Sequence, residues 1–246
     1  MKKVNRKSRV LASVLLGAVG LVISTAAQQP AVHKQNARPE SAISTGSPAP
    51  AVVPVKSSAR FGYEFTQPQF YVRHIVIEHD ASGRGKITFE RLNEEVPIVE
   101  NLEISSAAMG RVASLWQALR FLDSNTNYQS ERQFPHLGTM KLTMVDGERK
   151  RTAEFNWSNV AEAAELAKEY RRIADQANFV FDISVARENQ PLNAPKLMES
   201  LESLLKRNGL SDPQQLAPLL KEISGDERVP LIARNHALRI LAKINK

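Results

Sequence analysis

The dipeptide Asp146-Gly147, with β-favouring segments on both sides, constrains the fold of this chain more than any other local feature. Aspartate followed by glycine favours a two-residue type I′ turn, because both central residues of that turn have positive φ. The dipeptide therefore predicts an antiparallel hairpin over residues 139–156, with Met140 opposite Ala153. An antiparallel sheet is the first element of the expected fold.

A second hairpin is predicted earlier in the chain. Residues 70–78 and 86–92 are rich in β-branched and aromatic side chains, and a glycine-containing segment separates them. Alternation predicts that one face of this hairpin is buried. The side chains expected on that face are Tyr71, Ile75, Ile77, Ile87 and Phe89.

Two helices are predicted, one after each hairpin. The first covers about residues 105–123, with Ser105 or Ser106 as its N-cap and with apolar side chains three and four residues apart. Its buried positions are expected to be Met109, Val112, Trp116 and Leu119. The second helix starts at an N-capping sequence, Asn159-Val160-Ala161-Glu162, and its apolar stripe extends to Ala177.

The segment that follows, residues 179–187, is compatible with two structures. Its apolar side chains alternate as in a strand, yet no residue within it breaks a helix. Both a fifth strand and a continued helix therefore remain open.

From Pro195 onward the pattern is helical, and the last two helices resemble a HEAT repeat. The resemblance rests on residues 216–220 and 233–244, within about 210–246. Ala233 and His236 depart from the family pattern, which favours valine and alanine at these places. The resemblance implies an antiparallel helix pair, which we expect to pack against the α+β body.

Residues 70–177 are similar in outline to emfourin, a family of small bacterial inhibitors of thermolysin-like peptidases. The matching features are the order hairpin, helix, hairpin, helix, the serine-led helix with residues 115–122, and the turn at Asp146-Gly147. Residues 79–83 replace the glycine pair and aromatic residue typical of the family's first hairpin. The resemblance implies inhibition of a secreted metallopeptidase as an alternative function.

These patterns together predict an α+β fold. Two antiparallel hairpins form a sheet with two helices, in the order ββαββα, and an all-α HEAT-like segment follows. The expected organisation is a signal peptide or anchor at 1–27, a linker rich in proline, alanine and serine at 28–59, an α+β domain at 60–190 and a helical extension at 191–246.

The N-terminal segment predicts export. Its first nine residues carry five lysines and arginines, residues 10–27 are uncharged, and Thr25-Ala26-Ala27 offers small residues for cleavage. We expect a periplasmic or secreted protein that begins near Gln28. The alternative is retention as an anchor in the inner membrane, because 18 uncharged residues are at the lower limit for spanning a bilayer.

The same segment accounts for most of the basic charge. Five of the 33 lysines and arginines lie in it, so 28 remain against 26 acidic residues, and the formal charge of +7 falls to +2. A nucleic-acid partner is therefore not expected. The chain has no cysteine, which excludes disulfides, thiolate nucleophiles and cysteine-based zinc sites.

Motifs that carry catalysis or ligand binding are incomplete in this sequence. Residues 82–87 only partly match a phosphate-binding loop, and Ser203-Leu204-Leu205-Lys206 lacks the companion motifs of penicillin-binding enzymes. The five histidines have no metal-ligand spacing. We therefore predict no cofactor, no metal and no catalytic residue.

The long connection between residues 123 and 138 is the segment best suited to bind a partner. It carries four residues of the kinds that anchor interfaces, namely Tyr128, Arg132, Phe134 and His136. The favoured interpretation of the segment is nevertheless disorder or simple coverage of the sheet, with partner binding as the alternative.

The sequence thus favours an exported, non-enzymatic protein of the bacterial cell envelope or periplasm that binds another protein. An emfourin-like peptidase inhibitor is the first alternative. An envelope hydrolase, with carboxylates from different elements converging in a pocket, is the second.

Overall fold

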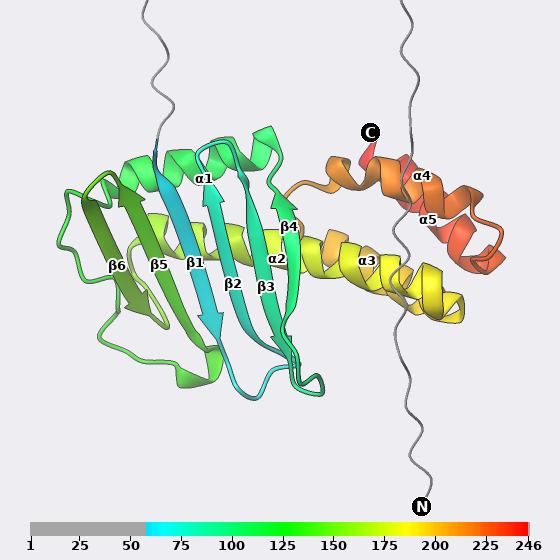
Figure 1. The fold of residues 1–246 in the computed structure, drawn as a ribbon, viewed down its shortest axis with the longest axis horizontal. Coiled ribbons are helices and arrows are strands. Elements are labelled where there is room, and N and C mark those ends of the chain that lie inside the picture. Colours follow the sequence, from blue (N-terminus) through cyan, green and yellow to red (C-terminus); the bar gives the residue numbers. More distant parts are fainter. Residues whose placement is uncertain (1–57, 246) are drawn as a thin grey trace, which may run out of the picture. The chain divides into compact units, whose positions relative to one another are not determined.

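The computed structural model describes residues 58–245. The predicted signal peptide or anchor lies outside them, as does the predicted linker except for its last two residues. The described residues form an α+β structure with a six-stranded antiparallel sheet and five α-helices (Figure 1). None of these helices combines the length and the apolar character needed to span a bilayer.

The sheet has the strand order β4-β3-β2-β1-β5-β6, and every neighbouring pair is antiparallel. Strand β1 lies at its centre and joins the two predicted hairpins, β2–β3 and β5–β6. Strands β4 and β6 form the edges. The bounds are β1 Arg60–Thr66, β2 Val72–Asp80, β3 Arg84–Arg91, β4 Ile98–Glu103, β5 Thr139–Asp146 and β6 Arg149–Phe155.

The sheet corrects the expectation of two hairpins, because β1 and β4 were not predicted. In β1, Phe61, Tyr63 and Phe65 alternate with less buried residues and point into the core. A central strand pairs on both sides, so these aromatic side chains cover the middle of the sheet. The α+β class is confirmed, and the sheet is larger than predicted.

The pairing of β5 with β6 also differs from the prediction. Asp146 is the last residue of β5, the turn residues are Gly147 and Glu148, and Met140 lies opposite Phe155 rather than Ala153. Of the two turn residues only Gly147 has a positive φ, 58°, which is the pattern of a type II′ turn with glycine first. The register shift is two residues, so each side chain keeps its predicted face.

In the first hairpin the buried face is confirmed, with one exception. Ile75, Ile77, Ile87 and Phe89 are all buried, whereas Tyr71 is 55% exposed. Tyr71 precedes β2, and the register of that strand shifts just after it, between residues 72 and 74. The alternation therefore does not extend back to Tyr71.

Helices α1 and α2 cover one face of the sheet (Figure 1). Ser105 caps α1 as predicted, with its hydroxyl accepting a hydrogen bond from the backbone N–H of Ala108, and the four predicted apolar positions are buried. The helices are α1 Ser106–Leu119, α2 Ala161–Asn189, α3 Ala194–Lys206, α4 Ala217–Gly225 and α5 Leu231–Ile244, with short 3-10 turns η1 Pro135–Leu137, η2 Pro191–Asn193 and η3 Pro213–Leu216.

Helix α2 is longer than the predicted second helix and includes residues 179–187. The N-cap is Val160 rather than Asn159, and the backbone N–H of Val160 donates to the Ser158 hydroxyl. Phe179 and Ile183, four residues apart, are buried against the C-terminal helices. This second packing partner explains why the segment continues as a helix although its apolar residues alternate.

Two apolar cores therefore share α2. The first lies between the sheet and the helices α1 and α2, and the second lies between the C-terminal part of α2 and α3, α4 and α5. Helices α4 and α5 pack against each other. Their relation to HEAT repeats stays a prediction.

Candidate binding groove

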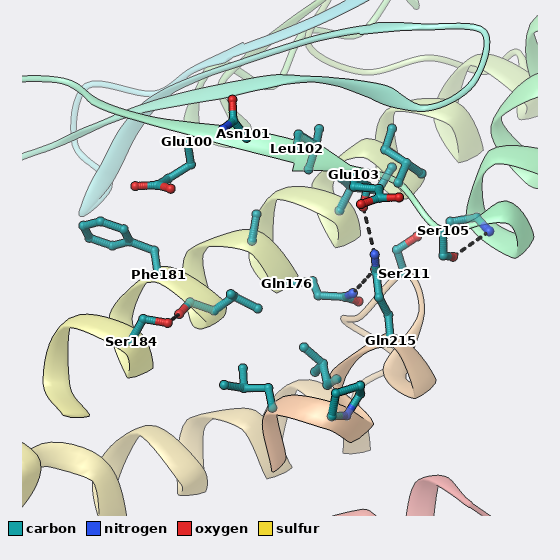
Figure 2. Close-up of a pocket in the computed structure, with 18 of the residues that line it drawn as sticks. Glu100, Asn101, Leu102, Glu103, Ser105, Gln176, Phe181, Ser184, Ser211 and Gln215 are labelled. Atoms are coloured by element: carbon teal, nitrogen blue, oxygen red, sulfur yellow. Dashed lines mark hydrogen bonds between the residues drawn. The ribbon is translucent and has the colours of Figure 1, made fainter. Parts of the chain in front are cut away.

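A groove of about 570 Å³ opens between the edge strand β4, the middle of α2 and the segment formed by η3 and α4 (Figure 2). Its volume is in the range of known ligand sites. Three stretches of chain that are far apart in sequence form its walls, and both apolar cores lie next to it. We call this site the β4 groove.

The floor of the β4 groove is apolar and partly open to solvent. On α2, Ala177, Val180 and Phe181 follow one another at helical spacing and face β4 across the groove, and Leu219 of α4 contributes to the opposite wall. Val180 is 36% exposed, and Val185 near the end of the floor is 41% exposed. Apolar side chains with this exposure, gathered in a concave site, are available to bind a partner.

The charged residues of the β4 groove are all acidic. They are Glu100, Glu103, Glu188 and Glu222, and no lysine, arginine or histidine among residues 58–245 lines the site. Glu222 forms a salt bridge with Arg187 at 3.2 Å. The other three make no salt bridge within residues 58–245. The groove is thus locally negative although the whole chain carries a formal charge of +7.

One end of the groove is closed by a pair of glutamines. Gln215 in η3 donates from its Nε2 to the backbone carbonyl of Glu103 at 2.8 Å, and its Oε1 accepts from Nε2 of Gln176 at 2.8 Å (Figure 2). Gln176 also accepts from the backbone N–H of Asp212 at 2.9 Å. These contacts connect β4, α2 and the start of η3.

A buried carboxylate of α2 also holds the segment that leads into η3. Glu169 of α2 accepts hydrogen bonds from Arg111, Arg172 and Ser211, at 2.8, 3.0 and 2.6 Å. Burial alone would raise the pKa of Glu169, but the hydrogen bonds from these three residues outweigh it and keep the pKa below its usual value. The carboxylate is therefore charged at neutral pH and acts as a structural link.

The other end of the floor is held by Arg91 at the end of β3. Its guanidinium donates to Asp182 of α2 at 2.6 Å and lies 5.4 and 5.3 Å from the ring centres of Phe89 and Phe181. Arg91 is 5% exposed. These contacts orient Phe181, which lines the groove.

The predicted partner-binding residues do not line this groove and do not act as one group. Tyr128 is 2% exposed, stacks on Phe121 with ring centres 6.0 Å apart, and its hydroxyl accepts from Arg151. It is part of the core, so it is not accessible to a partner. Arg132 and His136 are exposed, and half-buried Phe134 lies next to both of them.

The loop that carries these residues lies along the opposite edge of the sheet, beside β6. Arg151 of β6 donates to the carbonyls of Phe121 and Thr126, and the backbone N–H of Ser130 donates to the carbonyl of Trp157. This arrangement is what the coverage interpretation requires. Partner binding by Arg132, Phe134 and His136 stays a prediction.

The described residues include no group of three or more histidine or acidic side chains that could hold a metal ion. His79, Tyr170 and Trp116 form a buried hydrogen-bonded group inside the first core. Its contacts are internal, so it has a structural role.

The β4 groove was not predicted from the sequence. The sequence features that could have indicated it are the acidic residues of β4 and the exposed apolar residues Val180 and Val185 of α2.

No protein-family model matches the sequence, and no curated protein matches it. The function is therefore inferred from the geometry and the charge of the groove.

Proposed function

We propose that this chain is an exported, non-catalytic binding protein that holds a polypeptide partner in the β4 groove. The observation that carries the proposal is the combination of a solvent-open apolar floor with a lining that contains four glutamates and no cation. Export is supported by the charge and apolar pattern of residues 1–27, which lie outside the described residues.

The two properties of the groove have different roles in binding. Covering Val180, Phe181 and Leu219 removes apolar surface from water and supplies affinity. The carboxylates of Glu100 and Glu188 favour a cationic partner and oppose an acidic one, although Arg228 partly offsets the charge of Glu188. We further propose that α4 and α5, as a HEAT-like pair, serve as the rigid outer wall of this site.

The test of this function compares two matched variants. Val180→Asp places a charge in the floor, whereas Leu238→Asp makes a similar change at an exposed position of α5 outside the groove. Proteins captured from an envelope extract by the full chain are identified for each variant. We expect Val180→Asp to reduce the yield of the captured partner about tenfold or more, and Leu238→Asp to leave it unchanged. Equal capture by both variants, with unfolding transitions like that of the wild type, would contradict the proposal.

Export is tested separately by cell fractionation and by sequencing the N-terminus. We expect a soluble envelope protein that starts near Gln28. Recovery of an intact Met1 in the membrane fraction would instead establish the anchored form.

A further inference from the structure

We propose that the partner binds to the β4 groove as an added β-strand, and that it is an extended segment of another protein that carries both basic and apolar side chains on the face directed into the groove. This inference rests on the proposed function and specifies how the polypeptide binds in the groove. The segment would pair with the free edge of β4 and place its side chains between β4 and α2.

The free edge of β4 is defined by two hydrogen bonds. The backbone N–H of Ile104 donates to Gly83 at 2.9 Å, on the side of β3, whereas the carbonyl of Glu103 accepts from Gln215 on the opposite side. Successive residues of an antiparallel strand direct their backbone groups to opposite edges. The N–H and C=O of Val99 and Asn101 therefore point away from β3 and have no strand partner among residues 58–245.

The two edge strands of the sheet differ in how far their edges are covered. The edge of β6 has the loop of residues 123–134 beside it, whereas β4 contains no proline or lysine. Its charged residues are Glu100 and Glu103, which oppose pairing with an acidic strand but not with a basic one. The C-terminal helices stand across the groove from β4 and do not occupy its edge, apart from the contact of Gln215 with Glu103. The edge is thus open but confined, which suits a single strand.

The charge of the site specifies the chemistry of that strand. Figure 2 shows Glu100 and Asn101 leaving β4 in opposite directions, with Glu100 directed to the side on which Phe181 lies. A strand beside β4 would place alternate side chains on the side of Glu100, Phe181 and Glu188. Apolar residues fit the floor, lysine or arginine fits the carboxylates, and an acidic segment is repelled.

The glutamine pair limits the length and register of the added strand. Gln215 occupies the carbonyl of Glu103, so pairing ends there, and the open edge extends back to Ile98. Six residues of β4 span about 20 Å at about 3.4 Å per residue. The partner segment that pairs with β4 is therefore about four to six residues long, and Val99 and Asn101 lie in the middle of the edge that it covers.

The first experiment follows backbone amides by hydrogen exchange and NMR in the full mature chain. The probe is an end-capped octapeptide with the sequence Lys-Lys-Val-Val-Lys-Lys-Val-Val, which places both residue types on each face of an extended strand, and the control peptide has glutamate in place of lysine. We expect the lysine peptide at millimolar concentration to slow exchange of the Val99 and Asn101 amides about fivefold or more, and the glutamate peptide to have no effect.

The second experiment removes one edge amide. Asn101→Pro deletes an N–H that faces away from β3, a place where an edge strand tolerates proline, whereas Asn101→Thr keeps the amide and changes only an exposed side chain. We expect the proline variant to bind the lysine peptide about fivefold or more weakly than the threonine variant, which has the same position altered but keeps the amide. Unfolding transitions check that both variants are folded.

Each remaining outcome separates this inference from the proposed function. If the lysine peptide shifts the NMR signals of Val180 without protecting the Val99 amide, the groove binds polypeptide but not as a strand, and the inference fails alone. No binding of the peptide also overturns the inference, while the Val180→Asp capture result decides the function. If protection increases with protein concentration in the absence of peptide, the occupant is a second copy of the chain and the proposed partner is wrong.

Discussion

The hydroxyl of Ser211 donates a hydrogen bond of 2.6 Å to the carboxylate of Glu169, and this contact attaches the segment that leads into η3 to the middle of α2. The same carboxylate accepts from Arg111 of α1 and from Arg172. One buried acid thus connects the sheet-covering helices with the C-terminal wall of the β4 groove. The groove geometry depends on this connection.

Replacing Glu169 with alanine should lower the free energy of unfolding by about 2–3 kcal/mol, because a buried, multiply bonded carboxylate is removed and its donors lose their partner. Glu165→Ala is the matched control, since Glu165 lies one turn earlier on α2 and its salt bridge with Lys168 is more than half exposed. A change of less than about 0.5 kcal/mol is expected there. Denaturant titrations measure both values, and equal losses would contradict the role given to Glu169.

The same carboxylate should contribute to acid sensitivity. Its folded-state pKa lies below the usual 4.5, so its contribution to stability is complete above that value and is lost as the pH falls through the folded-state pKa. Between pH 6 and 3, the wild type should lose stability more steeply than Glu169→Gln, which cannot titrate at this position. Denaturant titrations across this range give both slopes, and parallel curves would show that Glu169 titrates alike in the folded and unfolded chains.

His79 should produce a second pH effect at a higher pH. Its Nδ1 lies 2.7 Å from the carbonyl of Asp80, which can only accept, so this nitrogen carries the proton and Nε2 accepts from the Tyr170 hydroxyl at 2.8 Å. Burial lowers the pKa of His79 below the usual 6.5 despite the opposing influence of Asp80. The histidine is therefore neutral in the folded chain at pH 7.

The unfolded chain takes up this proton more readily than the folded chain, so stability should be complete above pH 6.5 and should fall as the pH drops below it. His79→Gln removes the titrating group. We expect the stability of this variant, measured by denaturant unfolding from pH 7.5 to 5, to vary less with pH than that of the wild type. A wild-type curve no steeper than that of the variant would refute the assignment.

The parts of the fold that the sequence predicted well are those with a strong local pattern. Helix α1 has a capping serine and four apolar residues at helical spacing, and the β2–β3 hairpin has a continuous apolar face. Strand β1 was not predicted, although Phe61, Tyr63 and Phe65 alternate as in a strand. Strand β4 gives no such signal, because only Leu102 among its six residues is buried and no alternation is visible.

The candidate site was beyond prediction for a different reason. Glu100, Val180 and Leu219 meet only because α2 is long enough to contact both cores, and that length depended on how residues 179–187 were interpreted. Tyr128 shows that composition can also indicate a binding residue where the structure has a core residue. A tyrosine in a long loop has the composition of an interface anchor, but its stacking on Phe121 in the core is a tertiary contact that local sequence does not encode.

Two glycines with positive φ provide a final prediction, because their surroundings differ sharply. Gly138 has a φ of 86°, and a Cβ there would lie 2.5 Å from the Phe65 ring and 2.8 Å from the carbonyl of Thr66. Gly147 has a φ of 58° and no neighbouring atom within 4 Å of such a Cβ. Gly147→Ala should cost about 1 kcal/mol for the left-handed backbone alone.

Gly138→Ala should cost about 3 kcal/mol or more, because the strain of a backbone with φ 86° and ψ 177° is joined by displacement of a fully buried aromatic ring of β1. Thermal and denaturant unfolding of both variants give the comparison. Because Phe65 is in the central strand, its displacement should also change the NMR signals of Ile75, its partner across β1 and β2. Equal destabilisation by the two substitutions would mean that the loop before β5 yields without moving Phe65.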